Sequence, residues 1–224
     1  MAFDIDVFIN EFVSQLKNIY GNRLLFTGLQ GSYARGEATA DSDIDFVVII
    51  KDLTFEDLKD YKKLADISSY REKLCGFIAG DKELRNWSKF DLFQLIFDTK
   101  AVCGSLSDIV EKPSSDDVRT FVKINSENLY HGAVHSYLYS RTRHDDLSAF
   151  YKNVFYVLQG IYYLKSGKYF PTKQLLAGAL ENKDCEIFEI CLNRRDIAGK
   201  NTVEVEQLYE ELINWSRNNI KIYT

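Results

Sequence analysis

The chain has 224 residues, 46% hydrophobic and 14% aromatic, and its 28 Lys and Arg against 33 Asp and Glu give a net charge of -5. This length and composition are typical of a globular protein with one substantial core or two modest ones. No stretch approaches the ~20 apolar residues of a membrane span, and Asp4 and Asp6 lie where a signal peptide has its basic region. We therefore expect a cytoplasmic protein without a membrane partner.

The acidic charge argues against a nucleic-acid partner, and the spacing of the cysteines argues against bound zinc. Proteins that bind nucleic acid usually carry a basic stripe that neutralises several phosphates, and no long basic run is present. An acidic surface suits a small, often cationic ligand instead. The four cysteines form no Cys-x-x-Cys pair, which argues against a zinc site and favours small core residues: Cys75, Cys103, Cys185 and Cys191.

The chain begins with a predicted helix and a predicted strand. Residues 4–19 have apolar side chains at helical spacing, with acidic residues early and Lys17 late, as the helix dipole favours. Residues 23–30 form a short, largely apolar run bounded by glycines, which predicts a buried strand. A turn follows at Gly31 and Ser32, where free backbone N–H groups at the start of a short helix favour an anion.

A pair of acidic residues comes next, in Ser42-Asp43-Ile44-Asp45 before the apolar run 46–50. Side chains two apart in a strand point to one face, so Asp43 and Asp45 project together. Two aligned carboxylates form a hard-oxygen site suited to Mg²⁺, which completes its shell with water and substrate phosphates. Taken singly, the glycines could be turn residues, Ser32 a helix N-cap and Arg35 a surface charge.

The combination Gly31-Ser32-x-x-Arg35-Gly36 followed by Ser42-Asp43-x-Asp45 resembles the nucleotidyltransferase signature of the DNA polymerase beta superfamily. The resemblance covers residues 28–50 well and extends weakly to Asp91. It implies that Gly31 and Ser32 hold the β- and γ-phosphates of a nucleotide while the carboxylates hold metal. The residues that it assigns to nucleotide binding are Gly31, Ser32, Arg35 and Ser42, with Arg35 bracing the loop.

A mechanism with two Mg²⁺ ions needs a third carboxylate from a neighbouring strand. Asp91 is the candidate, because it opens the apolar segment 90–97, for which we predict a strand, and it matches the hydrophobic-Asp-hydrophobic position of the family. Asp98 is the alternative, and would otherwise be a strand-end turn residue. Between the strands, residues 54–78 begin with a capping-box pattern at Thr54 and predict a crossing helix.

The second half of the chain is predicted to be helical. Pro113-Ser114-Ser115-Asp116 predicts a turn and a helix N-cap, and helical spacing follows over 116–140, 146–166, 172–181, 184–194 and 202–219. The predicted fold class is therefore α+β: a polymerase-beta-like catalytic domain over 1–110, with helices packed on a small mixed sheet, and an all-α helical bundle over 111–224.

The segment 151–173 is the densest aromatic and basic part of that bundle. It is loosely similar to the helical substrate domain of aminoglycoside and lincosamide nucleotidyltransferases. In that interpretation Lys152 and Lys165 neutralise the triphosphate and Tyr151 stacks on the base. In the alternative, the aromatic residue belongs to the core and the lysines to the solvated surface.

The resemblance implies a Mg²⁺-dependent transferase that moves a nucleoside monophosphate to a hydroxyl of a small acceptor such as an antibiotic. We expect the transferred group to be AMP from ATP, with the nucleoside monophosphate of another NTP as the alternative. Asp43, Asp45 and Asp91 would hold the metals, and Asp91 could take the hydroxyl proton. Two alternatives remain: a transferase that modifies a protein or RNA partner, as the minimal antitoxin-type enzymes do, and a non-catalytic nucleotide-binding module.

Overall fold

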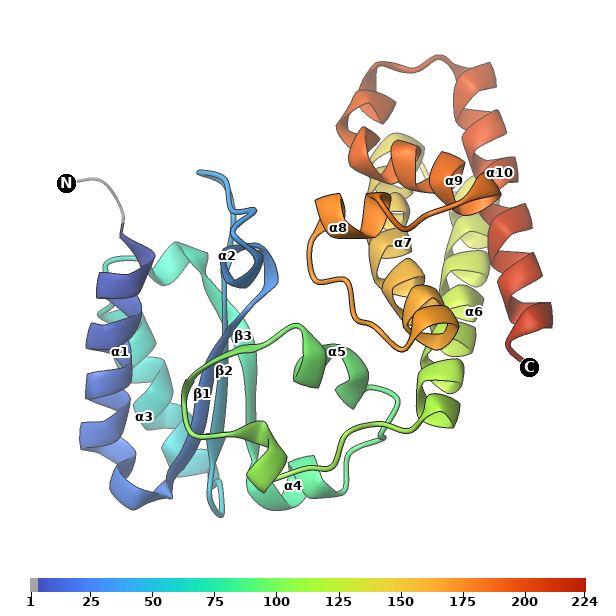
Figure 1. Cartoon of the computed structure of the whole chain (residues 1–224). Coiled ribbons are helices and arrows are strands. Elements are labelled where there is room, and N and C mark those ends of the chain that lie inside the picture. The colour runs from blue at the N-terminus through green and yellow to red at the C-terminus, as the bar shows by residue number, and fades with distance from the viewer. Residues whose placement is uncertain (1–3) are drawn as a thin grey trace. The chain divides into compact units, whose positions relative to one another are not determined.

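The computed structural model describes residues 4–224, and the chain divides into two compact units, Met1–Lys112 and Pro113–Thr224. We call them the N-terminal unit and the helical unit (Figure 1). The N-terminal unit contains, in chain order, α1 (Ile5–Tyr20), η1 (Gly21–Arg23), β1 (Leu24–Gln30), α2 (Gly31–Arg35), β2 (Ile44–Ile50), α3 (Phe55–Asp66), η2 (Arg71–Lys73), β3 (Leu74–Gly80), α4 (Asp81–Arg85), α5 (Leu92–Phe97), β4 (Lys100–Cys103) and η3 (Leu106–Asp108).

The N-terminal unit is built on a four-stranded mixed sheet in the order β3-β2-β1-β4. Strand β1 is antiparallel to both β2 and β4, whereas β2 and β3 run parallel. The expected mixed sheet with packed helices, followed by a helical region, is confirmed. Because β2 and β3 are parallel, both begin at the same end of the sheet, immediately after the segments that end in Asp43 and Lys73.

The two faces of the sheet have separate cores (Figure 1). Alternate side chains of β2 point to opposite faces. Phe46 and Val48 pack with α1 and α3 on one face, whereas Val47 and Ile49 pack with α4 and α5 on the other. The central strand is therefore buried on both sides, which holds the residues at its start in a fixed position.

The structure corrects the prediction between β2 and β4. Helix α3 ends at Asp66 and the strand β3 follows, so the helix expected over 54–78 is too long. Two glycines give the sequence of β3 a low strand propensity, which hid it. The strand expected over 90–97 is also wrong, because Leu92–Phe97 forms helix α5. Its buried side chains Leu92 and Leu95 are three apart and pack on the sheet as one helical face.

The helical unit contains α6 (Ser115–Tyr139), α7 (Arg143–Ser166), α8 (Lys173–Ala177), α9 (Asn182–Leu192), η4 (Arg194–Gly199) and α10 (Thr202–Ile222). These confirm the predicted helices, with ends that differ by a few residues. Ser114 caps α6, since its hydroxyl accepts a hydrogen bond from the Asp117 amide. Along residues 4–224, no helix is long and apolar enough to cross a membrane.

Candidate active site

The backbone turn between β1 and α2 lies against the carboxylate of Asp45. Helix α2 begins at Gly31, where φ is +69°, a left-handed conformation that favours glycine. A Cβ atom at this position would lie 2.1 Å from Oδ2 of Asp45. Gly31 is therefore needed for two reasons, because both its backbone conformation and the space beside it exclude a side chain.

Asp43 and Asp45 lie at the start of β2, where the strand leaves its loop. Asp43 is exposed, directly before the strand, and Asp45 is partly buried in it. In the register of the sheet, Gln30 of β1 lies beside Asp45 on one side and Cys75 of β3 on the other. Neither strand next to β2 thus provides a carboxylate beside Asp45, which differs from the expectation of a third acid on a neighbouring strand.

The loop between α2 and β2 is closed by its own hydrogen bonds. The Glu37 amide donates to the Ser32 carbonyl at 2.8 Å, and the Thr39 amide donates to the Ser42 hydroxyl at 2.9 Å. Ser42, which the family resemblance assigns to nucleotide binding, therefore serves the loop in this structure. The result is a short, internally bonded segment that leads from the glycine turn to the two aspartates.

Arg35 and Asp98 form a buried ion pair behind this loop. Arg35 Nη1 lies 2.5 Å from Oδ2 of Asp98, and the two side chains are only 7% and 5% exposed. Arg35 Nε also contacts Glu37, at 3.2 Å. Arg35 thus braces the loop, and Asp98, considered above as an alternative third acid, ties the end of α5 to α2. This role explains a conspicuous acid that sequence reasoning placed only at the end of a strand.

Asp91 lies at the start of α5 and lines a small cavity. The cavity has a volume of about 190 Å³, and its lining includes Gln30 and the ring pair Phe77 and Trp87, whose ring centroids are 5.5 Å apart. The side chain of Gln30 also donates to the Gln94 carbonyl of α5, at 3.4 Å. Gln30 therefore links the cavity to Asp45, its partner in the sheet register.

The donor set suits a hard metal ion at the aspartate pair. Mg²⁺ usually takes one or two protein carboxylates and fills its other positions with water and phosphate oxygens, and Asp43 and Asp45 are two such carboxylates. Within residues 4–224, no three His, Cys, Asp or Glu side chains are grouped to hold a metal. The structure therefore does not gather Asp91 with Asp43 and Asp45 into one ligand set.

The residues expected to contribute from the helical unit have structural surroundings of their own. Tyr151 is fully buried, and its hydroxyl donates to the Leu208 carbonyl at 2.9 Å, so the structure corrects the expectation that its ring stacks on a base. Lys152 is exposed on α7. Lys165 lies 3.2 Å from Asp184 and 4.4 Å from the Tyr162 ring centroid.

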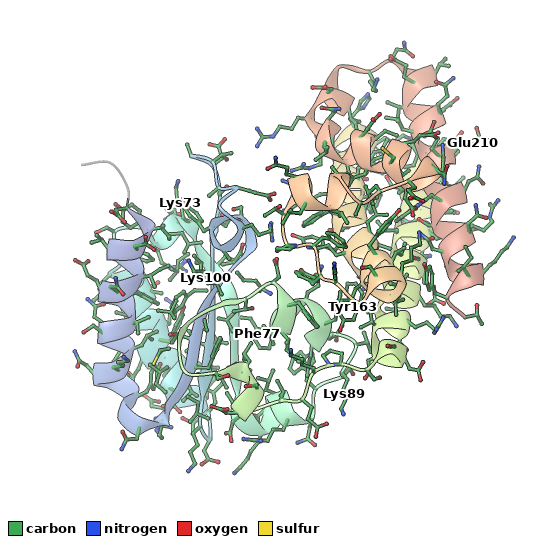
Figure 2. All side chains as sticks on the ribbon, viewed as in Figure 1. Lys73, Phe77, Lys89, Lys100, Tyr163 and Glu210 are labelled. Atoms are coloured by element: carbon green, nitrogen blue, oxygen red, sulfur yellow. The ribbon has the colours of Figure 1, made fainter. Side chains whose placement is uncertain are left out.

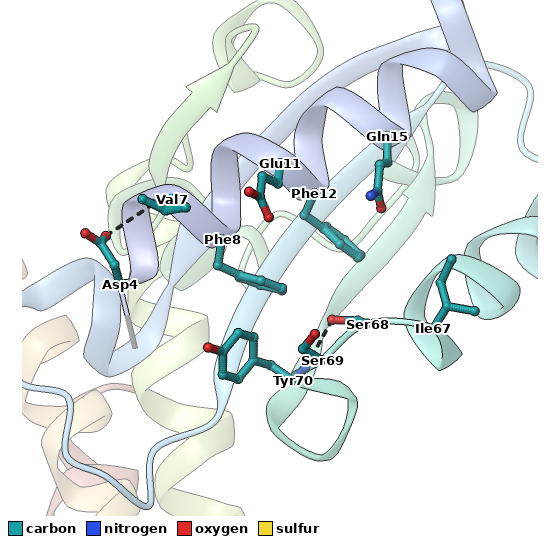
Figure 3. Close-up of a pocket in the computed structure, with 10 residues that line it drawn as sticks. All are labelled: Asp4, Val7, Phe8, Glu11, Phe12, Gln15, Ile67, Ser68, Ser69 and Tyr70. Atoms are coloured by element: carbon teal, nitrogen blue, oxygen red, sulfur yellow. Dashed lines mark hydrogen bonds between the residues drawn. The ribbon is translucent and has the colours of Figure 1, made fainter. Parts of the chain in front are cut away.

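A larger groove lies away from these residues. It has a volume of about 620 Å³ and is formed by α1 and residues 67–70 (Figure 3). Its floor includes Phe8, Phe12 and Tyr70, which belong to the core on the α1 side of the sheet. Neither Asp43 nor Asp45 lines it. The groove is thus separate from the cavity beside Asp91, which lies on the α5 side of the sheet.

Sequence reasoning missed Gln30 and Gly76, which lie on the two strands next to β2, and Lys73, which directly precedes β3. Gln30 directly precedes the glycine turn, and that position was the available signal. Gly76 has φ +146°, and a Cβ there would lie 1.9 Å from the Phe46 carbonyl oxygen. This glycine lets β3 approach β2 closely, but nothing could signal the approach while β3 itself was not predicted.

The fold and the site together define a nucleotidyl-transfer domain: a mixed sheet in which a glycine turn meets a carboxylate pair at the start of a central strand. The family comparison agrees, since the model of the nucleotidyltransferase domain matches residues 9–128. The chain belongs to the nucleotidyltransferase domain family. The expectation of a nucleotidyltransferase enzyme is therefore confirmed at the level of the family.

Known proteins resemble this chain over different lengths. Two candidate protein adenylyltransferases of Methanocaldococcus jannaschii are 41% identical over 59 residues and 48% identical over 48 residues. These matches cover 26% and 21% of this chain, and 40% and 47% of the relatives. The chain thus matches less than half the length of these curated relatives.

A solved structure resembles the whole chain. Spectinomycin adenyltransferase AAD(9) from Enterococcus faecialis, solved with ATP and spectinomycin, covers 97% of this chain and 100% of its own with a TM-score of 0.61. The two sequences are 18% identical. The likeness therefore shows a shared fold that includes the helical half.

Proposed function

We propose that this protein is a Mg²⁺-dependent adenylyltransferase that moves AMP from ATP to a hydroxyl group of a small molecule and releases pyrophosphate. The observation that carries the proposal is the contact between the glycine turn and Asp45, which is one of the two aspartates. A turn with free backbone N–H groups is a place for phosphate, and the nearby carboxylates are ligands for the ion that accompanies phosphate. Gly31 lies directly against Asp45, so both functions fall at one point.

The residues have distinct roles in this reaction. The acceptor oxygen attacks the α-phosphorus, a new P–O bond forms, and the bond to the β-phosphate breaks as pyrophosphate leaves. Gly31 and Ser32 orient the departing phosphates through the turn, and Asp43 and Asp45 would hold the metal. Bound there, Mg²⁺ would neutralise phosphate charge and lower the pKa of the attacking hydroxyl.

We propose that Asp91 accepts the proton of that hydroxyl. Its carboxylate is exposed and lines the cavity that Gln30 connects to Asp45. A carboxylate in such a place can act as a general base, provided that the acceptor reaches it within hydrogen-bonding distance. Because Asp91 starts a helix and is not grouped with the aspartate pair, its role in the proposal is proton transfer.

A small acceptor is favoured by the comparison over the full chain. Spectinomycin adenyltransferase, by its name, acts on an antibiotic, and its fold matches both the sheet and the helical half of this chain. The net charge of -5 also favours a cationic acceptor over a nucleic acid. A protein acceptor is the second candidate, supported by the names of the two archaeal relatives, which match this chain over a short segment.

The experiment that tests the proposal follows radiolabel from the α-phosphate of ATP. The full chain is incubated with labelled ATP, Mg²⁺ and pooled aminocyclitols, aminoglycosides and lincosamides, and separately with a cell extract. We expect label on a small molecule together with pyrophosphate release. Label only on protein would favour the second candidate. Binding of ATP without release of pyrophosphate in any pool would contradict the proposed transfer.

A further inference from the structure

Lys73 directly precedes β3, which runs parallel to β2. Ile44 pairs with Leu74 and Asp45 with Cys75, so Asp43 and Lys73 each directly precede the first paired residue of their strands, Lys73 as the last residue of η2. Adjacent strands are about 4.8 Å apart. Figure 2 shows Lys73 at the same end of the sheet as α2.

The close approach of the two strands is built into the fold. Gly76 lies three residues after Lys73, and it allows the β3 backbone to press against Phe46 of β2. Any larger residue at this position would force β3 away and move the start of the strand with it. The position of Lys73 relative to Asp43 therefore depends on a specific contact in the sheet.

The Lys73 ammonium group is turned toward the loop that leads to Asp43. It donates a hydrogen bond to the carbonyl of Ala40, and the residue is partly buried. In the part of the chain from residue 4 to 224, Lys73 contacts this neutral carbonyl and forms no ion pair. Its ammonium group is thus held by a neutral backbone carbonyl on the loop that leads to Asp43.

The other basic residue of the motif has its charge matched already. Arg35 is buried and contacts both Asp98 and Glu37. A nucleoside triphosphate brings several negative charges to a site that contains the Asp43 and Asp45 carboxylates, so further positive charge is needed beside them. Charge-assisted hydrogen bonds from an ammonium group to phosphate oxygens are among the stronger polar interactions in proteins.

We propose that Lys73 binds the nucleotide through its β- and γ-phosphates and leaves the Ala40 carbonyl when ATP enters. The inference rests on the proposed function, and it adds a phosphate ligand from a strand outside the glycine turn. As a result of these contacts, Lys73 would discriminate between nucleotides by the length of their phosphate chain. It therefore favours the binding of ATP over the binding of AMP.

The test measures binding of ATP and of AMP to the full chain by calorimetry with Mg²⁺, without acceptor and without turnover. The variants are Lys73→Met and Lys73→Arg, and Lys51→Met is the control because Lys51 is an exposed lysine just beyond the opposite end of β2. Thermal melting of each variant shows that the fold is retained. Lys73→Arg keeps the charge and distinguishes loss of the cation from damage to the strand.

We expect Lys73→Met to weaken ATP binding roughly tenfold, while AMP binding changes less than about twofold. Lys73→Arg and Lys51→Met should bind both nucleotides nearly as the wild type does. Equal weakening of ATP and AMP, or no change in either, would overturn the inference while leaving the proposed function in place. Failure of the wild-type chain to bind ATP at all would instead contradict the proposed function, and the inference with it.

Discussion

At the scale of single residues, two glycines with the same backbone conformation have different surroundings. Gly31 and Gly36 have φ of +69° and +71°. A side chain on Gly31 would meet the Asp45 carboxylate, whereas no atom lies within 4 Å of a Cβ built on Gly36. The pair therefore separates the effect of backbone strain from the effect of contact with the site.

We expect Gly36→Ala to lower the free energy of unfolding by about 1 kcal/mol, because it forces a side chain into a left-handed conformation. Gly31→Ala should lower it by more, because its methyl group must also displace the Asp45 carboxylate. Only Gly31→Ala should also lose AMP transfer, since its methyl group displaces Asp45. Urea unfolding and transfer assays on both variants give the comparison. Equal activity of the two variants would show that the Gly31–Asp45 contact has no catalytic role.

The structure places Asp91 on a different type of element from the strand that its sequence predicted. Its segment is apolar without a clear period, and a short apolar run does not distinguish a strand from a buried helix. The structure places it at the start of α5, where it lines a cavity. Its proposed role as a base therefore depends on the cavity, which the sequence could not reveal.

We expect Asp91→Asn to bind ATP with an affinity close to that of the wild type and to lower turnover by at least ~10²-fold, as loss of a general base does. Asp108→Asn, at an exposed aspartate of the same unit, is the control. Calorimetric titration with ATP and single-turnover transfer measure the two effects separately. Full turnover by Asp91→Asn would remove Asp91 from the mechanism.

At the scale of elements, α2 and α5 are joined by the buried pair of Arg35 and Asp98. Breaking a buried ion pair leaves an uncompensated charge, which usually costs more than the pair itself contributed. Here the remaining charge would be a guanidinium only 7% exposed. The pair thus connects the stability of the fold to the position of the glycine turn.

We expect Asp98→Asn to lower the free energy of unfolding by about 3 kcal/mol, because the Arg35 guanidinium loses its nearest carboxylate. Glu111→Gln, which removes an exposed partner of Lys89, should change it by less than about 0.5 kcal/mol. Urea unfolding of both variants at neutral pH provides the measurement. A stability close to the wild type for Asp98→Asn would mean that Glu37 alone satisfies Arg35.

Asp57 attaches helix α3 to Arg23 of η1, the short helix that directly precedes β1. Its carboxylate closes the capping box at Thr54 and contacts the Arg23 guanidinium, with Arg23 Nη1 at 3.0 Å from Oδ2. The hydrogen bond from Arg23 holds the pKa of Asp57 well below its usual range. A carboxyl whose pKa is lower in the folded state stabilises the fold above its unfolded pKa, and this stabilisation is lost as the pH falls.

We therefore expect the wild type to lose stability as the pH drops from about 5 toward 2, because the unfolded carboxyl takes up a proton near its ordinary pKa of about 4 and the folded one does not. Asp57→Asn should be less stable at pH 7 and should show a shallower fall. Asp60→Asn, on an exposed part of the same helix, should retain the wild-type slope. Parallel plots of unfolding free energy against pH for Asp57→Asn and the wild type would contradict this account.

Sequence reasoning succeeded where a local pattern determines an element and failed where distant contacts do. The β1–turn–β2 segment follows from apolar runs bounded by glycines, and Asp45 lies within the strand as expected. Strand β3 could not be predicted, because Gly76 is explained only by the β2 backbone against which it packs. Asp98 likewise acquires its role from Arg35, 63 residues earlier in the chain.

At the scale of the whole molecule, the helical unit has a core of its own that includes several aromatic residues. Tyr151 and Tyr209 are fully buried, and the hydroxyl groups of Ser136 and Tyr209 lie 2.7 Å apart between α6 and α10. Tyr151, the residue of α7 that the sequence suggested as a stacking partner for the base, is therefore a core residue of the helical unit.

The most direct test of the central claim compares two aspartates of one loop. Asp41 and Asp43 are both exposed and only two residues apart, but only Asp43 belongs to the proposed metal pair. With Mg²⁺, ATP and the acceptor found in the labelling experiment, we expect Asp43→Asn to lower the rate of pyrophosphate release by at least ~10²-fold, because the metal loses a carboxylate ligand. Asp41→Asn should stay within about twofold of the wild type. Equal rates for the two variants would contradict the assignment of Asp43 and Asp45 as the centre of nucleotidyl transfer.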